Sequence, residues 1–211
     1  MTTRTLTRRA ALATAAVTSA LVLAACGGNS DDNGGSGTGH TGHGASAASA
    51  TPSASAEAHN AQDVAFAKGM IPHHQQALEM AELAADRASS PRVKDLAARI
   101  EKAQDPEIRT LTGWLKAWGE QPPMAGMDHS GHAGMSGMMS EVDMAALKKA
   151  DGKDFDTRFL SLMAEHHQGA VEMATTEKQR GRSDDAKAMA DAIITAQNAE
   201  IKEMKQLLGA R

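Results

Sequence analysis

Two stretches of the chain repeat one combination of sulfur and imidazole side chains. In each, a methionine precedes two adjacent histidines by three and four residues, and a second methionine follows. The eight residues are Met70, His73, His74 and Met80 in the first stretch, and Met163, His166, His167 and Met173 in the second. On an α-helix this spacing places a thioether and an imidazole on one face. Such ligands suit Cu(I), whereas Mg, Ca and Mn prefer oxygen and zinc usually takes Cys or carboxylate beside His. The pattern predicts a copper site and leaves open which histidine of each pair ligates.

The same pattern has a plainer interpretation, because methionines at helical spacing usually fill a core. A single histidine on such a face is also usually a core residue with its hydrogen bonds satisfied. The recurrence of the histidine pair in the same phase favours a metal site over this alternative.

A segment between the two stretches offers further soft ligands. Within 16 residues rich in Gly and Ser it contains five methionines and two histidines, which are Met124, Met127, His129, His132, Met135, Met138 and Met139. A segment of this composition forms no core of its own, so we expect the sulfurs to bind metal. The alternative is a low-complexity linker without a ligand.

The chain contains an internal repeat that predicts its fold. Residues 63–118 match residues 156–211 at a constant offset of 93. Each copy shows two amphipathic helical stripes, with Asp63 expected to cap the first helix and Ser90 and Pro91 to begin the second. Gly119 is expected to follow the end of that second helix. Two hairpins that each expose an apolar stripe must bury it on each other, which predicts an all-α four-helix bundle.

Pro72 breaks a local rule, because proline inside a helix removes one hydrogen bond and clashes with the preceding turn. The sequence therefore predicts either that the regular helix begins near Pro72 or that it kinks there.

The N-terminal residues predict export and anchoring. Residues 1–25 combine a basic start, an apolar run and small residues before Cys26, which is typical of a lipoprotein signal peptide. Lipidation accounts for this lone cysteine better than a free thiol does. Residues 26–60 are expected to form a flexible tether, and residues 61–211 the folded domain with a Met/His-rich connector at 119–142. The predicted location is the extracytoplasmic face of the cell membrane, with Sec and twin-arginine export both open.

Composition excludes some partners. The formal charge is −4, and it becomes −7 once the three arginines of residues 1–25 are removed. An acidic domain is a poor match for nucleic acid. With three Phe, two Trp and no Tyr, the core must consist of small and straight side chains that suit helix packing.

The doubled motif resembles a bacterial family, the domain of unknown function numbered 305. Residues 69–74, Gly-Met-Ile-Pro-His-His, match the first motif of that family, and residues 163–168, Met-Ala-Glu-His-His-Gln, match the second. The resemblance covers about residues 60–208. It implies a ferritin-like fold and copper binding by the eight Met and His residues of the two stretches.

These observations favour a non-enzymatic envelope protein that sequesters copper or passes it to a copper-handling partner. One alternative is a ferritin-like metal oxidase, although that chemistry uses Glu-x-x-His pairs and the sequence contains none. Another is a metal-independent interaction or stress module. The sequence leaves the oligomeric state and the choice between storage and delivery open.

Overall fold

The computed structural model describes residues 58–123 and 136–210, which form five α-helices and no strand. The helices are α1 (Ala61–Arg87), α2 (Pro91–Ala117), α3 (Glu141–Lys149), α4 (Gly152–Arg180) and α5 (Asp184–Gly209). The predicted all-α fold is confirmed. None of the helices in the described ranges is long and apolar enough to cross a membrane. The predicted signal peptide, Cys26 and most of the tether lie outside the described residues.

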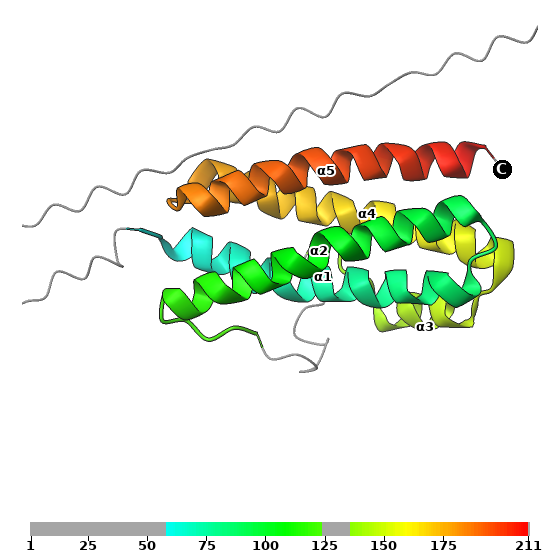
Figure 1. Ribbon diagram of the computed structural model, residues 1–211, viewed down its shortest axis with the longest axis horizontal. Helices are drawn as coiled ribbons and strands as arrows, with labels where there is room; N and C mark the ends of the chain where they lie inside the picture. The colour runs from blue at the N-terminus through cyan, green and yellow to red at the C-terminus, as the bar shows by residue number, and fades with distance from the viewer. Residues whose placement is uncertain (1–57, 124–135, 211) are drawn as a thin grey trace, which may run out of the picture. The chain divides into compact units, whose positions relative to one another are not determined.

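The four long helices form two hairpins that meet face to face. α1 packs along α2, α4 packs along α5, and the hairpins contact each other mainly through α1 and α4. Figure 1 shows the four helices extending in roughly the same direction. α3 lies against both α1 and α4. This short helix was not predicted, and it begins inside the segment that was assigned to the connector.

The start of α1 differs from the prediction. The N-cap is Asn60, whose side chain accepts hydrogen bonds from the backbone N–H of Gln62 and Asp63 at 2.8 and 3.1 Å. Asp63 is the third helical residue, and its carboxylate accepts a hydrogen bond from the Asn60 N–H. The two side chains thus form a reciprocal capping box. Asp63 therefore takes part in capping α1 as predicted, but it does so from the third helical position, and the N-cap itself is Asn60.

Pro72 lies inside α1, which extends without interruption from Ala61 to Arg87. Of the two predicted alternatives, a helix that begins near Pro72 is therefore excluded. Phe66, Met70 and Ile71 on the preceding turn are all buried. Their packing, together with the capping box, holds this turn in the helix although the proline contributes no hydrogen bond.

The second helix of each hairpin begins and ends close to the predicted positions. Ser90 occupies the N-cap of α2 with Pro91 next, although the Ser90 side chain makes no capping hydrogen bond. Beyond α2, Gly119 has a φ of 77°, a conformation that glycine adopts without strain. In the second copy, Ser183 caps α5 by accepting a hydrogen bond from the Ala186 N–H.

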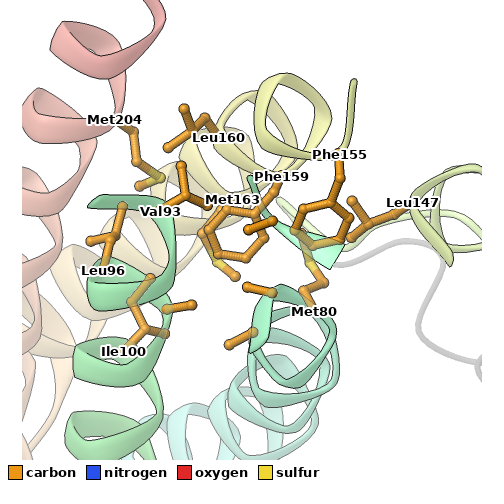
Figure 2. Close-up of a cluster of buried hydrophobic side chains, with 14 of the residues drawn as sticks. Met80, Val93, Leu96, Ile100, Leu147, Phe155, Phe159, Leu160, Met163 and Met204 are labelled. Carbon is orange, nitrogen blue, oxygen red and sulfur yellow. The ribbon is translucent and has the colours of Figure 1, made fainter. Parts of the chain in front are cut away.

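The interior consists of two apolar clusters. One contains Phe155, Phe159, Met80 and Met163 together with Leu147 from α3, as Figure 2 shows. The other lies toward the start of α1 and includes Phe66, Met70, Leu111, Leu115 and Ile193. Along both α1 and α4, the histidine pair falls between a methionine of one cluster and a methionine of the other. The domain therefore places its buried histidines where its two apolar clusters meet.

Candidate metal centre

His73 of α1 and His166 of α4 meet in the middle of the contact between the two hairpins. Their ring centroids are 3.8 Å apart, and the ring planes are inclined at 43°. Each residue is only 1% exposed. The two positions are equivalent in the repeat, so the pair lies where the pseudo-twofold relation brings α1 and α4 together. The sequence left open which histidine of each pair would take part in a site, and in the structure His73 and His166 are the two that face each other.

The polar atoms of this pair have no ordinary partners. Neither ring nitrogen of His73 or of His166 makes a hydrogen bond of normal geometry among the described residues. Buried polar atoms of this kind are uncommon, because water or a protein group usually satisfies them. The backbone of Ser136 lies beside the His73 ring, close enough to oppose slightly the lowering of the His73 pKa by burial.

Both imidazoles are held in the uncharged form. Burial, followed by repulsion from His74 and His167, lowers the pKa of His73 to about 3. Burial and the neighbouring imidazoles also lower the pKa of His166 well below its usual value. An uncharged imidazole retains the lone pair that a metal ion requires.

The adjacent histidines turn away from this pair toward the outer helices. His74 Nε2 lies 2.7 Å from Glu107 Oε2 of α2, and His167 Nε2 lies 2.8 Å from Glu200 Oε2 of α5. A carboxylate only accepts hydrogen bonds, so each Nε2 carries the proton and donates it. The Nδ1 atoms of both rings are buried without a hydrogen-bond partner in the described structure. Each carboxylate thus fixes one tautomer and leaves Nδ1 free to ligate an ion.

The four predicted methionines separate into two pairs. Met70 and Met173 belong to the apolar cluster at the start of α1, and Met80 and Met163 belong to the other. Met70, Met80 and Met163 are fully buried, and Met173 is partly buried. The antiparallel approach of α1 and α4 therefore places one methionine pair on each side of the histidines, instead of gathering all eight residues at one point.

Oxygen and nitrogen ligands alone do not complete a site here. In the described ranges, no three His, Cys, Asp or Glu side chains are arranged to hold a metal ion. The thioether sulfurs of the flanking methionines are the further candidate ligands near the histidine pair. The glutamates beside the second methionine of each stretch, Glu79 and Glu172, contact Lys148 and Ser136.

Only the end of the Met-rich connector lies within the described residues. Met124, Met127, His129, His132 and Met135 are outside them, whereas Met138 and Met139 are described and half-buried. The Met139 N–H donates to Gln76 Oε1 at 2.7 Å, and Gln76 Nε2 donates to the Met139 carbonyl at 3.0 Å.

Sequence reasoning missed four residues beside the histidines, namely Glu107, Glu200, Gln76 and Gly169. A signal existed for the glutamates, because they occupy equivalent repeat positions close to the buried stripe of their helices. Gln76 and Gly169 are also equivalent positions, three residues after His73 and His166. Their residue types differ, so the repeat gave no reason to select them.

Comparison with known proteins identifies relatives. A family model described as "Domain of unknown function (DUF305)" matches residues 63–208. No curated protein matches the chain. A DUF305 protein from Streptomyces coelicolor is 33% identical with a TM-score of 0.64, and the match covers 71% of this chain and 93% of that one. A DUF305 fragment from Deinococcus radiodurans is 32% identical with a TM-score of 0.65, covering 72% and 98%.

A third relative was solved with copper. CopM in a Cu(II)-bound form is 38% identical with a TM-score of 0.62, and the match covers 70% of this chain and 96% of CopM. CopM in a Cu(I)-bound form is 36% identical with a TM-score of 0.58 and the same coverage. The family model spans more than half of the chain, and these relatives share its helical architecture at more than 30% identity. The chain therefore belongs to the DUF305 family.

Proposed function

We propose that this protein binds copper at the His73–His166 pair, on the extracytoplasmic face of the cell membrane, without catalysing a reaction. The observation that carries the proposal is the contact between the two inclined rings, whose four nitrogens are buried and make no hydrogen bond of normal geometry among the described residues. An ion bound there would compensate for the cost of burying these nitrogens. Copper-bound structures of CopM, at 36% and 38% identity, support copper as the ion.

Each part of the predicted ligand set has a place in this proposal. His73 and His166 supply imidazole nitrogen, and flanking methionines supply sulfur, a combination that suits Cu(I). His74 and His167 add two further imidazoles, oriented by Glu107 and Glu200. The four long helices then serve as a ferritin-like four-helix bundle that encloses the ion. Lipidation of Cys26 would tether this bundle, and the connector methionines would collect ions near it.

The test is Cu(I) titration of the mature protein and of a variant with both His73 and His166 replaced by alanine. Native mass spectrometry counts the bound ions, and competition with a coloured Cu(I) chelator measures affinity. We expect the double variant to lose the tightest site while the connector keeps weaker ones. Replacement of His59, which stacks on Trp118 at a ring-centroid distance of 4.7 Å, is the matched control.

Thermal unfolding distinguishes this proposal from a metal-independent module. An ion bound only by the folded state raises the unfolding temperature as its concentration exceeds the Kd. We expect Cu(I) under reducing conditions to stabilise the wild-type domain and not the double variant. Equal melting temperatures with and without Cu(I) in the wild type would exclude a site in the folded domain.

A further inference from the structure

The end of the connector, residues 136–139, crosses from α4 to α1 and is here called the strap. At its first half, a Cβ added to Gly169 would overlap the Ser136 carbonyl and lie 2.6 Å from Gly137 Cα. At its last residue, both backbone polar groups of Met139 bond to the Gln76 amide. The strap thus has one anchor on each of the helices that carry the histidine pair.

The two anchors lie at equivalent repeat positions. Gln76 follows His73 by three residues, and Gly169 follows His166 by three residues. On a helix this spacing places each anchor on the same face as its histidine, about one turn away. The strap therefore crosses the contact between α1 and α4 at the place where the two histidine rings meet. Two contacts agree with this placement. The Ser136 backbone lies beside the His73 ring, and Gly137 lies against the His166 carbonyl.

The strap uses glycine where the chains come closest. Gly137 has a φ of 80°, and a Cβ there would lie 2.8 Å from the His166 carbonyl oxygen. Gly169 is the residue of α4 that permits this approach, since any side chain would displace the strap backbone. Glycine at both contacting positions allows the strap to lie directly on the helix.

Met138 lies between the two anchors and has no role in the apolar core. Met139 packs against the cluster that contains Met80 and Met163, whereas Met138 belongs to neither cluster although it is half-buried. Beside the strap, a pocket lined in part by Gln76, Met139 and Met144 opens between α1 and α3. Two methionines, Met139 and Met144, thus line an opening beside the strap.

We propose that Gln76 and Gly169 are positioning residues that hold the strap over the histidine pair, so that Met138 supplies a thioether ligand to the ion at His73 and His166. This inference rests on the proposed function and names one sulfur ligand of that site. It also accounts for the different residue types at these two equivalent positions. The strap needs the Gln76 amide on α1 and the free space beside Gly169 on α4.

The first experiment measures Cu(I) affinity by chelator competition. The mature protein carries Leu in place of Met124, Met127, Met135 and Met139 and Gln in place of His129 and His132, which removes the other connector ligands. In this background, Met138→Leu and Gly169→Ala are compared with Gly113→Ala, whose Cβ would meet no atom within 4 Å. We expect the first two substitutions to weaken binding about 10- to 100-fold, the range for loss of groups that support a metal site. Gly113→Ala should leave affinity unchanged.

The second experiment needs no metal. The Met139 N–H is bonded to Gln76, so its hydrogen exchange should be slow in the wild type and faster in Gln76→Ala and Gly169→Ala. Unchanged protection in both variants would overturn the positioning role. Wild-type Cu(I) affinity in Met138→Leu would overturn the ligand role, even where the His73/His166 double variant fails to bind. A double variant that binds as tightly as the wild type would instead refute the proposed function, and the ligand role of Met138 with it.

Discussion

The two ends of the helical domain contain equivalent buried aspartates in different surroundings. Asp63, near the start of α1, accepts hydrogen bonds from the backbone N–H of Arg182 and Ser183 at 3.0 and 2.9 Å. Asp156, near the start of α4, accepts them from the backbone N–H and the hydroxyl of Ser89 at 3.1 and 2.7 Å. Each aspartate therefore joins its own helix to the turn of the opposite hairpin, and this hydrogen-bonded contact occurs in both copies.

The surroundings differ at two further equivalent positions. Glu177 is fully buried beside Asp63, whereas the matching residue of the first copy is Ala84. Gly181, in the turn after α4, matches Ala88 in the turn after α1. A Cβ on Gly181 would lie 2.6 Å from the Glu177 carboxyl carbon, so the glutamate and the glycine occur together. One end thus combines a large buried side chain with glycine, and the other combines two alanines.

The histidine pair at the centre consists of equivalent residues, whereas the two ends differ. Because the pair takes one residue from each copy, a change in either copy alters it. Each end is built separately from one aspartate and one turn. A change there can be compensated locally by a second substitution, as the glutamate and glycine illustrate.

The largest effect is expected from removing the shared aspartate. Asp156→Ala leaves backbone N–H groups of the α1–α2 turn without their acceptor and should reduce the free energy of unfolding by about 3 kcal/mol. Asp63→Ala should cost a similar amount, because it bonds the opposite turn in the same way. Urea denaturation measures both, with Asp95→Ala as a control at an exposed pair with Arg99. A loss below 1 kcal/mol in both aspartate variants would show that the turns dock without these bonds.

Much of the fold follows from the periodicity of the sequence. The two stripes of each copy place four long helices correctly, because amphipathic spacing over about 25 residues is a strong signal. α3 was missed because it spans only nine residues next to a Gly/Ser-rich segment. The buried pair Met144 and Leu147, spaced by three, was the available signal. The Asn60–Asp63 capping box also has a sequence signal, because a cap-forming residue precedes an acidic residue by three positions.

The sequence shows where the histidine pairs lie on their helices, but it does not show which histidine of each pair faces the other hairpin. Adjacent residues on a helix differ in direction by about 100°, so the sequence could not decide whether His73 or His74 faces the other hairpin. That choice depends on the rotation of α1 against α4, which the packing of the apolar clusters sets. The partners Glu107 and Glu200 depend on the same rotation, and the strap depends on the path of an irregular segment.

The next prediction concerns the steric pair at the glutamate end. Gly181→Ala places a Cβ against the Glu177 side chain and should cost about 2 kcal/mol, within the range for overpacking a filled site. Adding Glu177→Ala should recover most of this loss, because the double variant reproduces the Ala84 and Ala88 combination of the other end. Urea denaturation of the single and double variants tests this coupling, and Gly113→Ala shows the effect of alanine at an open helical position. Additive effects of the two substitutions would mean that the residues do not compete for space.

The smallest effect expected is the pH dependence that Glu177 gives to one end alone. Burial, together with the neighbouring Asp63 carboxylate, raises the pKa of Glu177 to about 8, against weaker opposing effects of Gln62 and Lys187. Burial would also raise the pKa of Asp63, but hydrogen bonds from Glu177 and from nearby backbone N–H groups lower it. Asp63 therefore titrates below the range in which Glu177 does.

Because Glu177 binds its proton more tightly in the folded state, its contribution to stability is complete below the unfolded pKa of 4.5. It is lost as the pH rises toward 8, with a slope of at most about 1.4 kcal/mol per pH unit for one proton. Glu177→Gln keeps the shape of the side chain without its titration, so its unfolding free energy should fall less between pH 5.5 and 8. Urea denaturation across this range measures the difference, and parallel pH profiles for the wild type and Glu177→Gln would contradict the assignment. The end built around Asp156 has alanine at the matching position and contributes no such pH dependence. A difference between the pH profiles of the wild type and Glu177→Gln would therefore arise at the end that contains Glu177.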